Sequence, residues 1–258
     1  MYPVLFHIGS FKLYTYGLFV ALGFMTLIYV TRKYSDASSI SSEMLSNVFF
    51  IIFVSALLGA RLLYVIINFE AYRGNLSDIF KIWNGGFVFF GGFLSAVPAV
   101  AVYLKLKGLN VWEMSDILSP GMAFGHAVGR LGCFFAGCCY GKETDLPFAI
   151  LFSNPEALAP LNTNLHPTQL YEVFSNFVLF IILIWLMGRK KINGTVFLIY
   201  IILYSLFRFV IEFFRGDFRG DFFFEFISIS QGIGLMVFMG ALIILLWRLR
   251  VSHASDPI

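Results

Sequence analysis

The chain has 258 residues, of which 59% are hydrophobic and only 13% are charged, and its formal net charge at neutral pH is +3. A single soluble core of this length would use far less apolar surface. Lys and Arg are scattered over the loops instead of clustered on one face, which argues against nucleic acid as a partner. These features predict an all-α integral membrane protein.

Seven apolar runs are long enough to cross a hydrocarbon layer of ~30 Å as helices of ~20 residues. They are residues 14–30, 45–67, 86–104, 114–135, 170–187, 194–214 and 229–247. The fourth run is the least hydrophobic and contains Pro120 and several glycines. Residues 1–10 carry no Lys or Arg, so we expect the first run to be a retained helix, not a cleaved signal peptide.

Basic residues divide unequally between the two alternating sets of loops. One set has nine, namely Arg32, Lys33, Lys105, Lys107, Arg189, Lys190, Lys191, Arg248 and Arg250; the other has six, namely Lys12, Arg73, Lys81, Lys142, Arg215 and Arg219. Cytoplasmic loops carry the excess of positive charge, so we expect an external N-terminus and a cytoplasmic C-terminus. Residues 140–166, rich in proline, are then a small external head on a single polytopic domain spanning 1–258.

Charged residues inside the apolar runs are the main functional signal. Tyr204, Arg208, Glu212 and Arg215 are spaced four, four and three apart, so they form one stripe on a helix. One interpretation is a structural ladder of ion pairs. The other is an anion site, in which the forked donors of Arg208 bind a phosphate.

Two further arginines fall within apolar runs, where a charged side chain is either paired or part of a functional site. Arg130 lies in a glycine-rich stretch from Gly129 to Gly141. Arg61 follows Gly59 and Ala60, and we expect it to pair with an acidic side chain or a lipid headgroup.

The only three cysteines, Cys133, Cys138 and Cys139, lie in this same stretch. Their spacing matches no usual zinc motif, so we expect no metal and treat them as small buried hydrophobes. A disulfide involving Cys138 or Cys139 is an alternative in an oxidising compartment. His126 lies four residues before Arg130 and thus on roughly the same helix face, where it is either a base or a packing residue.

Motifs spread over nearly the whole chain resemble one family. In order they are Tyr16-Gly17, Gly59-Ala60-Arg61, Gly85-Gly86-x-x-Phe89-x-Gly91-Gly92, Gly129-Arg130-x-Gly132 with Gly137 and Gly141, His166-Pro167-Thr168-Gln169-Leu170-Tyr171-Glu172, and Tyr204-x3-Arg208-x3-Glu212-x2-Arg215. Together they resemble the prolipoprotein diacylglyceryl transferases, which are bacterial plasma (inner) membrane enzymes. The order and number of the motifs carry the resemblance, since each alone is weak.

The resemblance implies transfer of the diacylglyceryl group of phosphatidylglycerol to the lipobox cysteine thiol of a preprolipoprotein, with release of glycerol phosphate and no cofactor. It implies that Arg130 and Arg208 act on the phosphate, and that Tyr16, Tyr204 and Gly141 are also functional. Further implied substrate contacts are Arg61, Gly91, Gly92, Glu212 and Arg215. Glu212 would orient Arg208, and a monomer suffices.

Three positions depart from the pattern of the resembled family. Phe90 replaces a histidine that is a candidate base, Cys133 replaces an asparagine and Cys138 replaces a glutamate. His126 is one substitute base; alternatively no protein base is needed, because cations favour ionisation of a thiol, and we favour the second explanation.

Two other classes of function remain open on the sequence. A transporter or flippase for an anionic lipid or metabolite would use the same arginines between broken helices, although the chain shows no internal repeat. A membrane thiol-disulfide protein would depend on the three cysteines.

Overall fold

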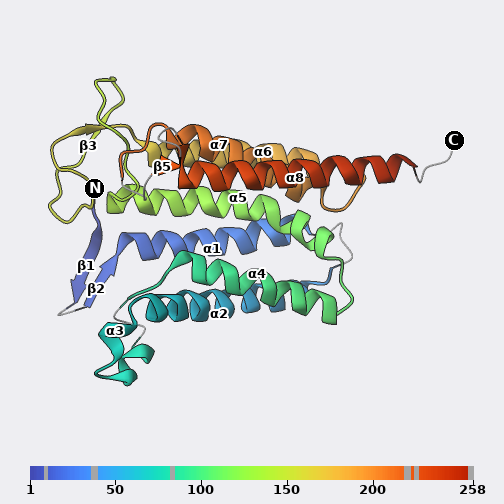
Figure 1. The fold of residues 1–258 in the computed structure, drawn as a ribbon, viewed down its shortest axis with the longest axis horizontal. Helices are drawn as coiled ribbons and strands as arrows, with labels where there is room; N and C mark the ends of the chain where they lie inside the picture. The colour runs from blue at the N-terminus through green and yellow to red at the C-terminus, as the bar shows by residue number, and fades with distance from the viewer. Residues whose placement is uncertain (9–10, 36–39, 82–84, 218–221, 224–226, 255–258) are drawn as a thin grey trace. The chain divides into compact units, whose positions relative to one another are not determined.

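The computed structural model describes residues 1–8, 11–35, 40–81, 85–217, 222–223 and 227–254 (Figure 1). Arg219, which contributed to the predicted orientation, lies outside the described residues. The chain divides into two compact units, one formed by Met1–Tyr34 with Ser115–Ile258 and the other by Ser35–Met114.

Each of the seven expected runs forms a long helix. The first unit holds α1 (Thr15–Tyr34), α6 (Thr168–Met187), α7 (Thr195–Glu212), α8 (Ile229–Ala254) and all but the first turn of α5 (Val111–Ala136); the second holds α2 (Ser42–Ile67) and α4 (Phe89–Leu106). Six of the seven are long and apolar enough to cross a membrane, and α5 is the exception. Pro120 lies inside α5 and does not end it.

Short strands, which the apolar pattern did not predict, complete the first unit. An N-terminal hairpin pairs β1 (Val4–Ile8) with β2 (Phe11–Tyr14), and β5 (Phe222–Phe223) pairs with β6 (Ile227–Ser228). In the expected head, β3 (Ile150–Leu151) pairs with β4 (Asn164–Leu165). Phe152, Ala159 and Leu165 form a small core there, so this segment packs on itself.

Close backbone approach joins α1 to α5. A Cβ atom on Gly23 would lie 2.6 Å from the carbonyl oxygen of Gly125, and one on Gly125 would lie 2.5 Å from that of Gly23. Only glycine permits this separation, as in other tightly packed membrane helices. The glycines of the fourth run therefore position a neighbouring helix and do not break their own.

A buried carboxylate ties α5 to the start of α7. Asp116, which is 0% exposed, accepts hydrogen bonds from the backbone N–H groups of Gly194 and Phe197, both at 2.8 Å, and pairs with Lys190 at 2.9 Å. These N–H groups belong to the first turn of a helix and have no partner within it. Because α7 also packs against α6 and α8 (Figure 1), Asp116 fixes the starting position of the helix that carries Arg208.

In the second unit, α2 packs against α4, and α3 (Phe69–Tyr72) and a short 3-10 helix, η1 (Leu76–Phe80), connect them. A Cβ on Gly59 or on Gly91 would collide with the backbone carbonyl oxygen of the other residue. Gly91 and Gly92 are both buried. Helix packing within this unit thus accounts for the paired glycines.

Replacing Gly125 with alanine should destabilise the protein, because the added methyl group would force α1 and α5 apart. Overpacking of this kind costs about 1–3 kcal/mol. The midpoint of thermal unfolding in detergent should fall for Gly125→Ala. Gly240 of α8 has open space around its Cβ position, so the control Gly240→Ala should unfold at the wild-type temperature or above it; equal midpoints for the two variants would refute this account of the contact.

Candidate functional site

Glu172 lies at the centre of a buried charge cluster in the first unit. This residue, in the second turn of α6, is 2% exposed. Its carboxylate oxygens lie 2.5 Å from Arg130 Nε, 3.1 Å from Arg215 Nη1 and 3.8 Å from Arg208 Nη1. One carboxylate therefore gathers three arginines from α5, from α7 and from the segment after α7.

Glu212 holds Arg208 along α7. Its carboxylate lies 2.5 Å from Arg208 Nη1, one helical turn away, and accepts a hydrogen bond from the Ser228 hydroxyl at 3.1 Å. Nη1 of Arg208 is buried and lacks hydrogen-bond geometry toward either glutamate. Glu212 thus contacts Arg208 directly, as its expected role in orienting this side chain requires.

The three arginines differ in how fully the protein encloses them. The Arg215 side chain is 3% exposed, and it donates to both carboxylate oxygens of Asp217, at 2.9 and 2.6 Å, as well as to Glu172. Burial alone would lower the pKa of Arg215, but hydrogen bonds to Asp217 and Cys139 outweigh it and raise the pKa above its ordinary value. The side chains of Arg130 and Arg208 are each 14% exposed, so these two retain access from outside.

His126 and Tyr204 complete the surroundings of Arg130. The Nε of Arg130 donates to His126 Nε2 at 3.1 Å, and the rings of His126 and Tyr204 lie 5.3 Å apart. The Tyr204 hydroxyl interacts with Arg130 as well. Because Nε2 of His126 accepts this hydrogen bond, its lone pair is already engaged by a cation.

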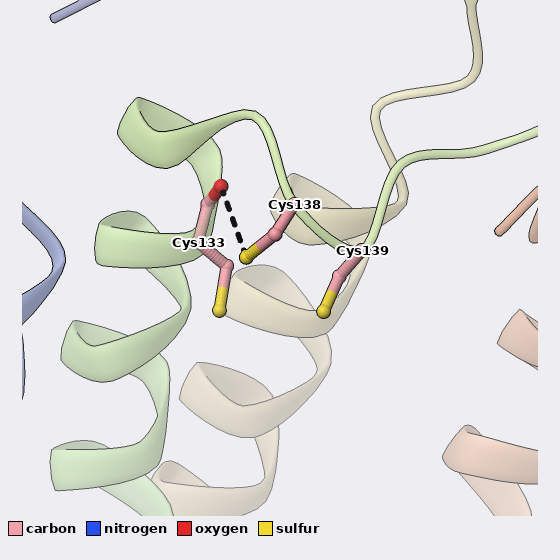
Figure 2. A group of neighbouring side chains, drawn as sticks. All are labelled: Cys133, Cys138 and Cys139. Carbon is pink, nitrogen blue, oxygen red and sulfur yellow. Dashed lines mark hydrogen bonds between the residues drawn. The ribbon is translucent and has the colours of Figure 1, made fainter. Parts of the chain in front are cut away.

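The three cysteines converge where α5 ends (Figure 2). Gly137 has φ +72°, its N–H donates to the Phe134 carbonyl, and the N–H of Cys138 donates to the Cys133 carbonyl at 3.1 Å. These two bonds define a Schellman cap, which brings the side chains at the positions of Cys133 and Cys138 together. The cysteines are present as thiols, and their Sγ atoms all lie within 4.8 Å of one another.

The start of α6 holds this cysteine loop in place. The Thr168 hydroxyl donates to the Cys139 carbonyl and the Gln169 amide donates to the Cys138 carbonyl, both at 2.8 Å. Cys139 itself has φ +60°, a conformation that non-glycine residues seldom adopt. The motif from His166 to Glu172 therefore fixes both the loop and the arginines.

Gly141 lies between two strand-like segments. Its N–H donates to the His166 carbonyl, and the neighbouring Lys142 donates to the Phe214 carbonyl at 2.8 Å. A Cβ on Gly141 would collide with His166 and would lie 2.9 Å from the Phe214 carbonyl oxygen. A side chain at position 141 would therefore disturb the segment that directly precedes Arg215.

Tyr16, at the start of α1, also belongs to this region. Electrostatic interactions connect its hydroxyl with Arg130 and with the three cysteines. A Cβ on Gly132 would lie 3.3 Å from the Tyr16 carbonyl oxygen and 2.8 Å from Phe19. Gly132 therefore allows α1 to approach the end of α5 at Tyr16.

Three predicted substrate contacts, Arg61, Gly91 and Gly92, belong to the second unit. The guanidinium of Arg61 donates five hydrogen bonds to the backbone carbonyls of Asp78, Ile79, Lys81, Gly85 and Gly86, at 2.6 to 3.4 Å. A guanidinium has five N–H donors. In the described residues, Arg61 thus binds η1 and the loop before α4 and not an acidic side chain; the alternative partner, a lipid headgroup, stays a prediction.

Glu172 was not among the predicted site residues. Its place at the end of the motif that begins at His166 does not specify its distance from the arginines. The spacing of the cysteines likewise did not predict that their sulfur atoms lie close together. A search for an acidic partner of Arg130 and Arg208 would have pointed to Glu172, because charged side chains in apolar runs pair with one another or with backbone carbonyls.

These features define a helical membrane protein with a buried arginine–carboxylate cluster at one end of its helices. The family model described as prolipoprotein diacylglyceryl transferase matches residues 3–247. A relative from Clostridium tetani, named phosphatidylglycerol–prolipoprotein diacylglyceryl transferase, is 36% identical over 235 residues, covering 91% of this chain and 93% of the relative. One of the same name from Vibrio vulnificus is 33% identical over 261 residues, covering 99% and 94%. The chain belongs to the prolipoprotein diacylglyceryl transferase family, as the motifs predicted.

Removing the charge of Glu172 should destabilise the protein strongly. Loss of one partner from a buried ion pair costs about 3–5 kcal/mol, because the opposite charges stay buried. Glu172→Gln should therefore lower the midpoint of thermal unfolding by many degrees. Glu70→Gln breaks an exposed pair with Arg73, which is worth at most about 1 kcal/mol, and should change the midpoint little; a Glu172→Gln midpoint close to that of the control would contradict the central role of Glu172.

Proposed function

We propose that the chain transfers the diacylglyceryl group of phosphatidylglycerol to the lipobox cysteine thiol of a preprolipoprotein, forming a thioether and releasing glycerol phosphate. Family membership and the names of the relatives support this activity. The observation that carries it is the pair Arg130 and Arg208, held by Glu172 and still partly accessible. No finding favours the transporter alternative.

The reaction requires a thiolate sulfur to attack the glyceryl carbon that bears the phosphate. The carbon–sulfur bond forms while the carbon–oxygen bond breaks, and its electron pair leaves with the phosphate oxygen. Fixed cations stabilise this developing charge far better in a low-dielectric site than in water. Arg130 and Arg208 have this role in our proposal, and Arg215 holds the framework around them.

An apolar groove on the same unit can take part of one acyl chain of the lipid. Its volume is ≈ 160 Å³, and it lies between α7 and α8 with Arg208 adjacent to it in sequence. Its lining consists of Ser205, Leu206, Phe209, Gly234, Leu235 and Phe238. We place part of one acyl chain of the donor lipid in this groove, beside the helix that carries Arg208.

We further propose that α5 is a seventh span, that the N-terminus and the head at 140–166 are external, and that the chain is a monomer in the bacterial plasma (inner) membrane. This topology requires the predicted cytoplasmic segments to share one end of the unit. Lys190 pairs with Asp116, and Arg248 donates to the Asn193 carbonyl at 2.8 Å. Two predicted cytoplasmic segments thus meet at one end of the unit. The arginine cluster lies at the other ends of α5, α6 and α7, near the outer surface.

Loss of Arg208 should abolish most of the transfer. The assay uses purified protein, phosphatidylglycerol with a labelled headgroup and a lipobox peptide, and it follows glycerol phosphate release together with peptide mass. Arg208→Ala should lower kcat about 10²–10³-fold, by analogy with other transition-state donors. Arg208→Lys should retain part of this activity, because it keeps the charge and loses the fork.

Two results would overturn the proposed function. The first is folded wild-type protein that binds the lipid without releasing glycerol phosphate. The second is Arg208→Ala with full turnover. Arg73→Ala, which removes an exposed arginine of the second unit, serves as the matched control and should behave as wild type.

His126 should be dispensable as a base. Its Nε2 accepts a hydrogen bond from Arg130, and the same cations favour ionisation of the substrate thiol. His126→Ala should therefore reduce turnover by less than about tenfold, whereas loss of a general base costs about 10²–10⁴-fold. A loss in the higher range, with an unchanged unfolding midpoint, would identify His126 as the base.

A further inference from the structure

We infer that Cys133, Cys138 and Cys139 bind a zinc ion whose fourth ligand is the thiol of the substrate peptide. This inference rests on the proposed function, because the fourth ligand is the nucleophile of that reaction. It goes against the expectation from the sequence spacing, which indicated no metal. The structure shows that the three sulfur atoms lie close together, which the spacing of the cysteines does not reveal.

The first observation is the convergence of sulfur atoms in the protein. All three cysteines of the chain meet at one point, with their Sγ atoms within 4.8 Å of one another. Figure 2 shows Cys133 on the last turn of α5 and the other two on the loop that follows, with the sulfur of Cys138 directed at the Cys133 carbonyl oxygen, 3.8 Å away. Sulfur ligands favour soft and borderline ions, of which zinc is the common divalent one.

The spacing of the sulfurs suits such an ion after small side-chain rotations. A Zn–S bond of ~2.3 Å with tetrahedral angles corresponds to sulfur–sulfur distances of about 3.8 Å. The sulfurs must therefore approach by at most about 1 Å, which changes in χ1 can provide. The backbone need not move, because the helix cap and the bonds from Thr168 and Gln169 already fix it.

The surrounding charges suit a thiolate-rich centre. Zinc with three thiolates carries one net negative charge, which needs compensation in a low-dielectric site. Arg130 Nη1 lies 3.7 Å from Cys139 Sγ, and Arg215 hydrogen-bonds the same side chain. These guanidiniums are outer-shell partners of the kind that orient metal ligands and tune the metal.

Three protein ligands leave one tetrahedral position open, as in catalytic zinc sites. A thiol that coordinates zinc loses its proton outright, so the lipobox cysteine would arrive as a thiolate without a protein base. The proton passes to solvent, the sulfur forms its bond to the glyceryl carbon, and the phosphate oxygen leaves with the electron pair. The thioether product is neutral and a weaker ligand, so it dissociates from the metal.

The position of the cluster suits this step, because it adjoins the proposed phosphate site. Arg130 contacts both Cys139 and Glu172. A thiolate bound beside Cys139 would therefore lie close to the carbon whose phosphate Arg130 neutralises. His126, the nearest alternative base, already accepts a hydrogen bond from Arg130.

The test begins with metal content and does not depend on activity. Purified full-length protein in detergent, loaded with zinc and desalted, should hold one zinc per chain. Cys133→Ser and Cys138→Ser should each reduce zinc retention at least about tenfold, and Glu70→Gln should retain it fully. Cobalt in place of zinc should show thiolate charge-transfer bands, and these should change on addition of a lipobox peptide but not of its Cys→Ser analogue.

Activity then separates this role from adventitious binding. Zinc-free wild-type protein, prepared with a chelator, avoids any effect of a substitution on folding. At pH 7 it should lose most of its transferase activity and regain it with zinc. The residual activity should rise about tenfold per pH unit toward the ordinary thiol pKa of ~8.5, whereas the zinc-loaded enzyme should depend little on pH over that range.

Several results would overturn the inference. They are full activity of the zinc-free protein, an unchanged pH profile, zinc retention by both serine variants, or a disulfide among the three cysteines in active protein. A cobalt spectrum that responds to the peptide, with no glycerol phosphate released, would instead support the metal site and refute the proposed transfer.

Discussion

The carboxylate of Glu172 is the constraint on which the rest of the first unit depends. Three arginines in an apolar environment repel one another, and burying them together is possible only around a fixed negative charge. Glu172 provides that charge from the start of α6, between α5 and the end of α7. The positions of Arg130 and Arg208 relative to each other therefore follow from a residue that belongs to neither helix.

Close backbone contacts make this arrangement possible. Gly23 and Gly125 bring α1 against α5, Gly132 brings Tyr16 to the same helix, and Gly141 lets the chain pass between two other segments. In a membrane the hydrophobic effect does not press helices together, so packing of small residues and polar contacts must do so. Glycine motifs and charged motifs thus act together. The glycines set the distances between helices, and these distances bring the charged side chains into contact.

Arginine has two distinct roles in this protein. Arg61 donates hydrogen bonds to five backbone carbonyls. Arg215 is enclosed by Asp217 and Glu172, so both arginines stabilise segments of the chain. Arg130 and Arg208 are restrained yet less enclosed. The resemblance to the family grouped all four as substrate contacts, because motif positions do not show which partners each side chain has. The distinction lies in the partners, which depend on loops and turns of irregular conformation.

The sequence by itself determined the class of protein, the seven long helices and the family, and it singled out Arg130 and Arg208 as candidates for the site. Hydropathy and helical periodicity are local properties, and motif order needs no three-dimensional information. Only the tertiary structure decided that Glu172 joins three arginines, that Asp116 anchors α7, and that a short hairpin precedes α1. It also decided that Cys-x4-Cys-Cys becomes one sulfur cluster, through a helix cap and two residues of positive φ. These contacts connect residues from different helices or depend on single backbone angles, and no periodic pattern in the sequence encodes either.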